Sequence, residues 1–279
     1  MKKTLLTFLS VCIALGAMAQ GKAGHKVVQT SVKPAEVVVN KDRIEHPFKG
    51  SMDGQRVDGY RGIWFTIGQA RSDYGDKYSG GLGTYTMKHI PMAVYSKEAD
   101  KTFFVYGGAP DARENYLLCM IGCYDHKSGM LSKPVVVHDK GCYRVCDPHD
   151  DPTVQIDKDG HIWVFVAGRA NKRPGIRYRS VKPYDISAFE YVNESIMAYP
   201  EVIYDKEKGF FLFDTRYDGI RRTFFQTSKD GVNWSDFQPI ASIIEPGEEK
   251  SGHYQFANYD GEKLVCCFNR HICLLYTSD

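Results

Sequence analysis

The sequence lacks a strong net charge, a long apolar run after its first residues, and any stretch with the periodicity of a long amphipathic helix. Its 279 residues hold 36 Lys and Arg against 34 Asp and Glu. This balance excludes general electrostatic capture of nucleic acid or of an anionic membrane. The missing apolar run excludes a membrane-spanning helix beyond the amino terminus, and the missing helical periodicity argues against a helical fold.

The amino terminus has the features of a cleavable export signal. Lys2 and Lys3 precede an apolar run at residues 5–15, and Ala17 and Ala19 supply the small residues that a signal peptidase recognises. We expect residues 1–19 to be the leader, cut after Ala19, and the protein to be secreted or periplasmic. The mature chain then has 34 basic and 34 acidic residues and is formally neutral.

The carboxyl terminus has an unusual sequence, CLLYTSD at residues 273–279. It matches the translation of the transposon end that is used to build sequencing libraries. We therefore expect residues 273–279 to be adapter sequence, and residues 20–272 to be a partial domain.

An exported chain can form disulfides, so its cysteines need an interpretation. Cys119 lies in the apolar run LLCMI, which predicts that its C-x-x-x-C pair consists of buried strand thiols rather than metal ligands. Cys142 and Cys146 bracket a turn, where a local disulfide is an alternative to a metal site. Sequence alone leaves the pairing open among the cysteines outside the leader and tail, which are Cys119, Cys123, Cys142, Cys146, Cys266 and Cys267.

Short runs of alternating apolar and polar residues, each ending in a Gly, Asp or Asn turn, recur along the chain. Their spacing of about fifty residues is near the period of propeller blades, which are four-stranded sheets set around an axis. We therefore expect an all-β fold, a β-propeller of four-stranded blades, with about five blades here against the seven common in such folds. The clearest runs are residues 102–108, 152–160, 161–166, 201–213 and 254–268.

One turn has a distinctive sequence, SKDGVNW at residues 228–234. Asp230 and Gly231 can close a hairpin through side-chain hydrogen bonds and a left-handed backbone, and Trp234 can cover the sheet. The motif resembles a shortened Asp-box of sialidase-type propellers. The box is structural wherever it occurs, so it supports the architecture and indicates no activity.

Several longer motifs lie between about residue 59 and residue 271, namely residues 77–96, 101–108, 147–152 (DPHDDP), 199–200, 214–219 (DTRYDG) and 252–255 (GHYQ). They resemble the BNR-repeat family of exported bacterial propellers, which includes ulvan lyases and enzymes that cleave rhamnosyl-glucuronate linkages. The resemblance implies a carbohydrate-active enzyme that acts on an anionic, uronate-containing polysaccharide. It implies neither a nucleic-acid partner nor a membrane span.

In ulvan lyases a His, a Tyr and an Arg cluster on one propeller face, and the resemblance places these roles on His149, Tyr199 and Arg216. The chemistry requires such groups, because β-elimination at C4 of a uronate removes the proton at C5. Arg216 would neutralise the adjacent carboxylate, Tyr199 would accept or donate the proton, and His149 would be its partner acid or base. Each residue also has a structural alternative. His149 would be held in a turn by Asp side chains, Tyr199 would be a tyrosine without a special role, and Arg216 would form an ion pair with Asp214 or Asp218.

A second site competes with the first. In the rhamnosyl-glucuronate-cleaving relatives, activity lies on the opposite propeller face around a histidine, and His89 is its match here. Sialidases carry Arg-Ile-Pro at a comparable point, so the His89 replacement argues against sialic acid as the substrate. The structural alternative is a buried His89 bonded to backbone. A third hypothesis is a noncatalytic glycan-binding propeller, with Trp64 and Trp163 as stacking platforms.

Substrate binding is predicted for Arg169 and Arg173, because basic residues gather in the loop after a predicted strand. It is also predicted for Trp163, as an aromatic platform. A solvated basic face is the alternative for this group, which comprises Arg169, Lys172, Arg173, Arg177 and Arg179. His253 and His271 are candidate ligands of a structural zinc such as some relatives have, and calcium is an alternative metal. Nothing in the sequence calls for an organic cofactor.

Overall fold

The computed structural model describes residues 71–72, 75–76, 89–108, 117–140, 148–169, 173–217, 221–241 and 251–272, all within one compact unit, Val32–Asp279. The predicted leader at residues 1–19 and the adapter-like residues 273–279 lie outside these ranges, as do Trp64, Cys142 and Cys146. No helix in the described ranges is long and apolar enough to cross a membrane.

The described chain folds into antiparallel sheets whose strands follow one another in sequence. The first sheet contains β3 (Ala93–Ser96), β4 (Lys101–Gly108), β5 (Leu118–Asp125), β6 (Met130–Leu131) and β7 (Val135–Asp139). The second contains β8 (Pro152–Ile156), β9 (Ile162–Val166), β10 (Gly175–Ser180) and β11 (Phe189–Ser195). The third contains β12 (Ala198–Asp205), β13 (Gly209–Tyr217), β14 (Arg221–Ser228) and β15 (Gln238–Ala241).

Two further hairpins complete the described strands. A parallel bridge between Arg221 and Gly252 joins the third sheet to β16 (Ser251–Tyr259), which pairs with β17 (Leu264–Ile272). A separate pair comprises β1 (Arg71–Ser72) and β2 (Gly75–Asp76). The prediction of an all-β fold built from repeated, mostly four-stranded antiparallel sheets is confirmed.

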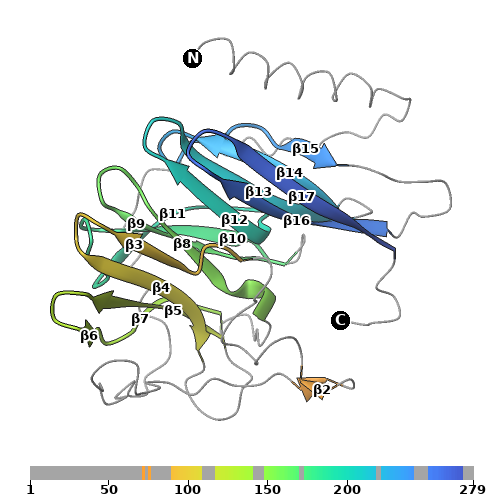
Figure 1. The fold of residues 1–279 in the computed structure, drawn as a ribbon. Helices are drawn as coiled ribbons and strands as arrows, with labels where there is room; N and C mark the ends of the chain where they lie inside the picture. The colour runs from red at the N-terminus through yellow and green to blue at the C-terminus, as the bar shows by residue number, and fades with distance from the viewer. Residues whose placement is uncertain are drawn as a thin grey trace. The chain divides into compact units, whose positions relative to one another are not determined.

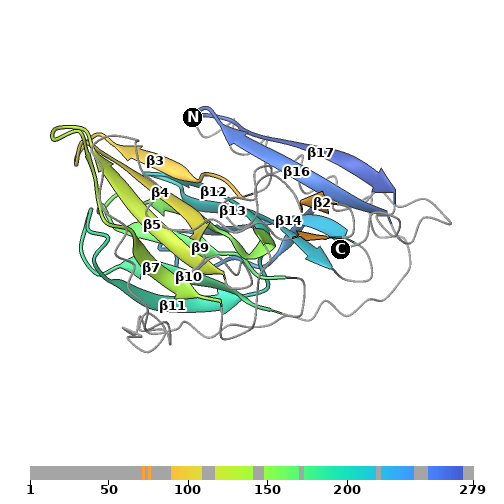
Figure 2. The same cartoon turned by 90° about the horizontal axis from the view of Figure 1, so that it is seen from below.

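The sheets meet along their first strands (Figures 1 and 2). Strand β8 contacts both β3 and β12, and β12 also contacts β16. Each sheet is a meander that starts at such a strand and proceeds outward. The beginnings of the four first strands therefore form one end of the assembly, and the tight turns that follow these strands form the other.

Two apolar cores fill the spaces between neighbouring sheets. Phe103, Val105 and Ile121 of the first sheet belong to one core with Val154 and Val164 of the second. The other core joins the second and third sheets through side chains that include Trp163, Phe165, Val192, Val202, Phe210 and Leu212. All five residues of β9 are buried, which explains why this strand is continuously apolar instead of alternating.

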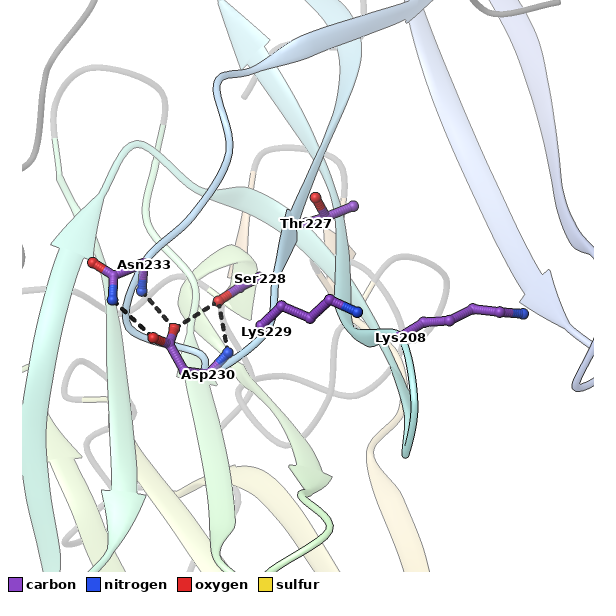
Figure 3. Close-up of a pocket in the computed structure, with 6 residues that line it drawn as sticks. All are labelled: Lys208, Thr227, Ser228, Lys229, Asp230 and Asn233. Atoms are coloured by element: carbon purple, nitrogen blue, oxygen red, sulfur yellow. Dashed lines mark hydrogen bonds between the residues drawn. The ribbon is translucent and has the colours of Figure 1, made fainter. Parts of the chain in front are cut away.

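The SKDGVNW turn forms the hairpin that its sequence predicts (Figure 3). The Ser228 hydroxyl accepts a hydrogen bond from the Gly231 amide at 2.8 Å, and the Asp230 carboxylate accepts the Val232 amide at 2.9 Å. It also accepts the Asn233 amide at 2.7 Å, as Figure 3 shows. Gly231 has a φ of 73° and packs against a tryptophan ring, so a side chain does not fit there. Trp234 donates its indole N–H to the Gly231 carbonyl at 2.8 Å.

We expect Asp230→Ala to lower the free energy of unfolding by about 1–2 kcal/mol, because two turn amides lose their acceptor. Chemical denaturation measures the change. Asp236→Ala is the matched control, since Asp236 is an exposed residue of the same hairpin. Equal stability of the two variants would contradict a structural role for the Asp230 carboxylate.

Candidate functional site

Four ring-bearing side chains meet at the beginnings of the first strands. His89 precedes β3, His149 lies in the short 3-10 helix η2 (Pro148–Asp150) before β8, Tyr199 is the second residue of β12, and Tyr254 lies in β16. The Tyr199 ring centroid is 5.4 Å from that of His149, 6.1 Å from that of His89 and 5.7 Å from that of Tyr254, each in an edge-to-face arrangement. We call these four residues the Tyr199 cluster.

The backbone of Tyr199 departs from regular strand geometry. Its φ is 56°, in the left-handed region that residues other than glycine seldom adopt, and the pairing of β12 with β13 shifts between Ala198 and Glu201. Gln255, itself buried, donates from its amide to the Tyr199 carbonyl at 3.5 Å, and accepts the Thr215 hydroxyl at 3.1 Å. Such strain is characteristic of positions that orient a functional side chain.

The segment that carries His89 is held between two sheets. The Ile90 amide donates to the Pro200 carbonyl at 3.3 Å, and the Val202 amide donates to the Ile90 carbonyl at 2.8 Å. On the other side, the Val154 amide donates to the Pro91 carbonyl at 3.0 Å. These contacts bring His89 beside Tyr199, so the two candidate sites share one face, and a catalytic role for His89 stays a prediction.

His149 is positioned by the residue that follows it. The buried Asp150 carboxylate accepts a bond from Lys140 Nζ at 2.9 Å and binds the Arg173 guanidinium through Nε and Nη2 at 2.9 and 2.6 Å. Lys140 Nζ also donates to the Ala167 carbonyl at 2.8 Å. This ionic clamp fixes η2, and with it the direction in which His149 faces.

Three of the four residues of the Tyr199 cluster are closed to solvent in this structure, whereas Tyr254 is partly buried. The exposed fraction is 0% for His89 and 2% for both His149 and Tyr199. A ligand can reach these rings only if residues around them move.

Arg216 lies at the same end of the third sheet as the Tyr199 cluster, but none of the contacts given above joins it to the cluster. It follows Thr215, which pairs with Ala198, so it lies at the same end of the third sheet as Tyr199. Its Nη2 donates to the Ile196 carbonyl at 3.3 Å, and its Nε lies 3.7 Å from Asp214 Oδ2. Because side chains alternate along a strand, Arg216 points to the face of β13 opposite that of Thr215.

A second buried charge accompanies this arginine. Asp214 is fully buried, and this burial raises the pKa of its carboxyl to about 7, although the nearby Arg216 and Arg177 lower it. Arg177 is buried as well, and burial lowers the pKa of its guanidinium to about 10. Arg177 is thus not part of a solvated basic face.

The structure places the predicted substrate-binding residues in different surroundings. Trp163 is fully buried, and its indole N–H donates to Asp157 Oδ2 at 2.8 Å, so its prediction as a sugar-stacking platform is wrong. Arg173 is engaged in the ionic clamp, and its backbone pairs with that of Arg169 near η2. Substrate contacts of Arg169 and Arg173 remain predictions.

The structure also bears on the cysteine and metal predictions. Cys119 and Cys123 are buried strand thiols, as predicted, and burial raises the pKa of both. The backbones of His253 and His271 lie in the β16–β17 hairpin, but their side chains lie outside the described residues. Across the described ranges, no group of three or more His, Cys, Asp or Glu side chains could hold a metal ion.

One hollow that described residues line lies elsewhere. It has a volume of about 270 Å³ and is lined by Lys208, Thr227, Ser228, Lys229, Asp230 and Asn233 (Figure 3). These residues lie at the end of the third sheet where Ser228 pairs with Phe210, whereas Tyr199 lies at the end where Ala198 pairs with Thr215. The hollow is therefore not part of the Tyr199 cluster.

Sequence reasoning missed two residues of this region, Tyr254 and Gln255, and considered Asp214 only as an ion-pair partner of Arg216. Tyr254 and Gln255 stand in the GHYQ motif, and Asp214 begins the DTRYDG motif. The available signal was positional, because GHYQ opens the last predicted strand run just as His149 and Tyr199 open earlier ones. The sequence analysis gave roles to Arg216 and His253 of these motifs, but none to Tyr254 or Gln255.

The fold is similar to that of a solved polysaccharide lyase, described as an ulvan lyase of family PL25. One structure of it has 19% sequence identity and a TM-score of 0.61, with 78% of this chain and 50% of that chain covered. Another, bound to -[GlcA(1-4)Rha3S]-, has 18% identity and a TM-score of 0.60, with the same coverage. An N-acetylgalactosamine deacetylase from F. plautii is more distant, at 17% identity and a TM-score of 0.39, with 67% and 66% covered.

The likeness to the ulvan lyase, together with the repeated antiparallel sheets, shows an all-β propeller fold. This chain spans about half the length of the ulvan lyase that it matches. No protein-family model matches it, and neither does any curated protein sequence.

Proposed function

We propose that this protein is an exported polysaccharide lyase that cleaves a uronate-containing polysaccharide by β-elimination at the Tyr199 cluster. The observation that carries the proposal is that the rings of His89 and His149 both contact the Tyr199 ring, and that Tyr199 has a strained backbone conformation. The fold likeness to an ulvan lyase solved with a glucuronate-containing oligosaccharide supports the same substrate class. The leader-like residues 1–19 support action outside the cytoplasm.

The reaction assigns one task to each group. Arg216 binds the uronate carboxylate and neutralises its charge, which makes the C5 proton more acidic. Tyr199, ionised by transfer of its proton to a neighbouring histidine, accepts the C5 proton. The electron pair of the C5–H bond then forms the C4–C5 double bond as the C4–O bond breaks. The leaving oxygen takes a proton from Tyr199 or from the protonated histidine, so charge and protons balance.

The second candidate is cleavage of a terminal rhamnosyl-glucuronate linkage centred on His89. The proximity of His89 to Tyr199 favours this second candidate, because the same rings would serve either reaction. The products separate the two candidates: elimination leaves an unsaturated uronate that absorbs in the ultraviolet, whereas hydrolysis releases rhamnose without it. A noncatalytic glycan-binding propeller would give neither product.

We expect the purified protein to generate ultraviolet absorbance from ulvan, and His149→Ala to lower kcat by about 10²- to 10⁴-fold, because the base that activates Tyr199 is lost. The kcat of His89→Ala measures how much the second histidine contributes to the rate. His126→Ala is the control, since His126 is an exposed histidine that bonds Thr102 at 2.8 Å, away from the cluster. Rhamnose release without absorbance, lost in His89→Ala alone, would replace the lyase assignment by the second candidate.

A further inference from the structure

The hollow beside the SKDGVNW turn contains two positively charged side chains that the proposed reaction does not use. Its lining includes Lys208, from the turn between β12 and β13, and Lys229, from the SKDGVNW turn. The two turns are joined directly, because Lys229 Nζ donates to the Glu207 carbonyl at 3.0 Å. Both lysine side chains extend from their turns in the same direction (Figure 3). The hollow thus combines two ammonium groups from adjacent turns.

Lys208 is held in place by the neighbouring β16–β17 hairpin. Its Nζ donates to the Tyr259 hydroxyl at 2.8 Å and lies 5.1 Å from the centre of the same ring. That hydroxyl is itself held by Asp205 Oδ2 at 2.7 Å and by the Gly261 carbonyl at 2.6 Å. The bond to Tyr259 raises the pKa of the Lys208 ammonium, which keeps it charged at neutral pH. An ammonium has three N–H donors, so Lys208 can bond a ligand while it bonds Tyr259.

The aspartates around the hollow are engaged by the turns themselves. Asp230 accepts two amides of its own turn through Oδ1 and Asn233 Nδ2 through Oδ2. Asp205 accepts the Lys208 amide at 2.7 Å through Oδ1 and acts on the Lys208 ammonium through charge, as does the exposed Glu207. The hydrogen-bond partners that the structure gives the two ammonium groups are a hydroxyl and a carbonyl. Both lysines therefore keep donors for an anion.

The rest of the lining consists of short polar side chains. Thr227 contributes a hydroxyl, and Asn233 contributes an amide whose nitrogen already bonds Asp230. Groups of this kind bond sugar hydroxyls, while the lysines suit a carboxylate. The volume of about 270 Å³ equals that of roughly nine water molecules, which is room for one sugar unit. Because the ammonium groups are anchored before a ligand arrives, little side-chain freedom is lost on binding.

We propose that this hollow is a second, noncatalytic binding site for a uronate-bearing sugar unit, whose carboxylate lies between the Lys208 and Lys229 ammonium groups. The site is at the end of the third sheet away from Tyr199, so it holds a part of the polysaccharide that is not being cleaved. Two attachment points on one polymer raise its local concentration at the protein. The choice of a uronate rests on the proposed function, whereas the anion site itself rests on the two lysines.

The test is a titration followed by nuclear magnetic resonance. The probe is a uronate-containing oligosaccharide prepared from ulvan, compared with the same oligosaccharide after its carboxylates have been reduced to alcohols. We expect the Asn233 amide signal to shift with the first and not with the second, and added salt to weaken the binding. Lys229→Gln should weaken it by about 3- to 10-fold, because a charge-assisted hydrogen bond is lost.

Lys206→Gln is the matched control. Lys206 lies in the same turn as Lys208, but its ammonium pairs with Glu98 at 3.1 Å. The variant removes the same charge without changing the lining, so we expect binding like that of wild type. Glu207→Gln should instead strengthen binding by about 2-fold, because its charge acts on Lys208. Equal weakening by Lys206→Gln and Lys229→Gln, or equal shifts with the reduced oligosaccharide, would overturn the site.

Cleavage kinetics separate this inference from the proposed function. Lys229→Gln should leave kcat unchanged and raise KM by about 3-fold for long ulvan chains but not for short oligosaccharides, since only a long chain reaches both sites. If the protein does not cleave ulvan, the proposed function fails, and the titration still decides the site. Cleavage without a shift of the Asn233 signal would overturn the site and leave the proposed function standing. Circular dichroism establishes that the variants are folded.

Discussion

Tyr199→Phe should lower kcat for uronate elimination by about 10²- to 10⁴-fold, while KM and the melting temperature change little. The phenylalanine ring preserves the three edge-to-face contacts that hold Tyr199 against its neighbours. It also leaves the backbone contact with Gln255 in place. The variant therefore removes the phenolic O–H alone, which is the group that exchanges the proton in the proposed reaction. Initial rates of ultraviolet absorbance measure the effect.

Tyr95→Phe is the matched control for this change. Tyr95 is 54% exposed and donates its hydroxyl to Asp100 at 3.0 Å, near the turn at the far end of β3 from His89. We expect its activity to equal that of wild type. If Tyr199→Phe were also fully active, the Tyr199 cluster would be a packing feature and not a catalytic one.

The second large effect is expected on stability. Asp150→Ala should lower the free energy of unfolding by about 3–5 kcal/mol, because it leaves Lys140 buried without its carboxylate. Loss of the clamp should also release η2, so that lyase activity falls even at temperatures where the variant remains folded. Chemical denaturation and activity measured on the same preparation report the two effects.

A double variant tests the physical reason for that loss. Adding Lys140→Met to Asp150→Ala removes the uncompensated ammonium, so we expect part of the lost stability to return while activity remains low. Glu98→Ala is the control, since Glu98 forms an exposed ion pair with Lys206 at 3.1 Å and should leave stability unchanged within error. A single Asp150→Ala variant as stable as the control would contradict the clamp.

The fold was predictable because each strand run carries its own signal. Alternation and turn residues at 201–213 predict the β12–β13 hairpin, which the structure extends to Ala198 at one end and Tyr217 at the other. Residues 228–234 predict their turn from side-chain chemistry alone, and the hydrogen bonds of Ser228 and Asp230 follow that prediction. These are local interactions, and the sequence specifies them directly.

The errors concern interactions between distant parts of the chain. His89 is 110 residues from Tyr199 in sequence, and no local pattern tells which sheet ends meet. Had the first strands been aligned, the common position of His89, His149 and Tyr199 at or before their beginnings would have predicted the cluster. Trp163 was misjudged for another reason: in a strand buried on both faces, a large aromatic residue is core rather than a binding platform.

The role of Asp150 depended equally on long-range partners. Sequence identified it as a neighbour of a candidate residue, and treated it as part of an alternative to function. The structure shows Asp150 bound to Lys140 and Arg173, from segments before and after it. An acidic residue next to a candidate site can thus support that site. Sequence spacing alone does not distinguish such a supporting residue from a member of an isolated ion pair.

The most direct test of the account is the identity of the product that the purified protein releases from ulvan. Mass spectrometry distinguishes an unsaturated uronate oligosaccharide from a hydrolysis product, because the former is lighter by one water. The account predicts the unsaturated product from wild type and its loss in Tyr199→Phe. Saturated products, or unsaturated products formed equally well by Tyr199→Phe, would contradict β-elimination at the Tyr199 cluster.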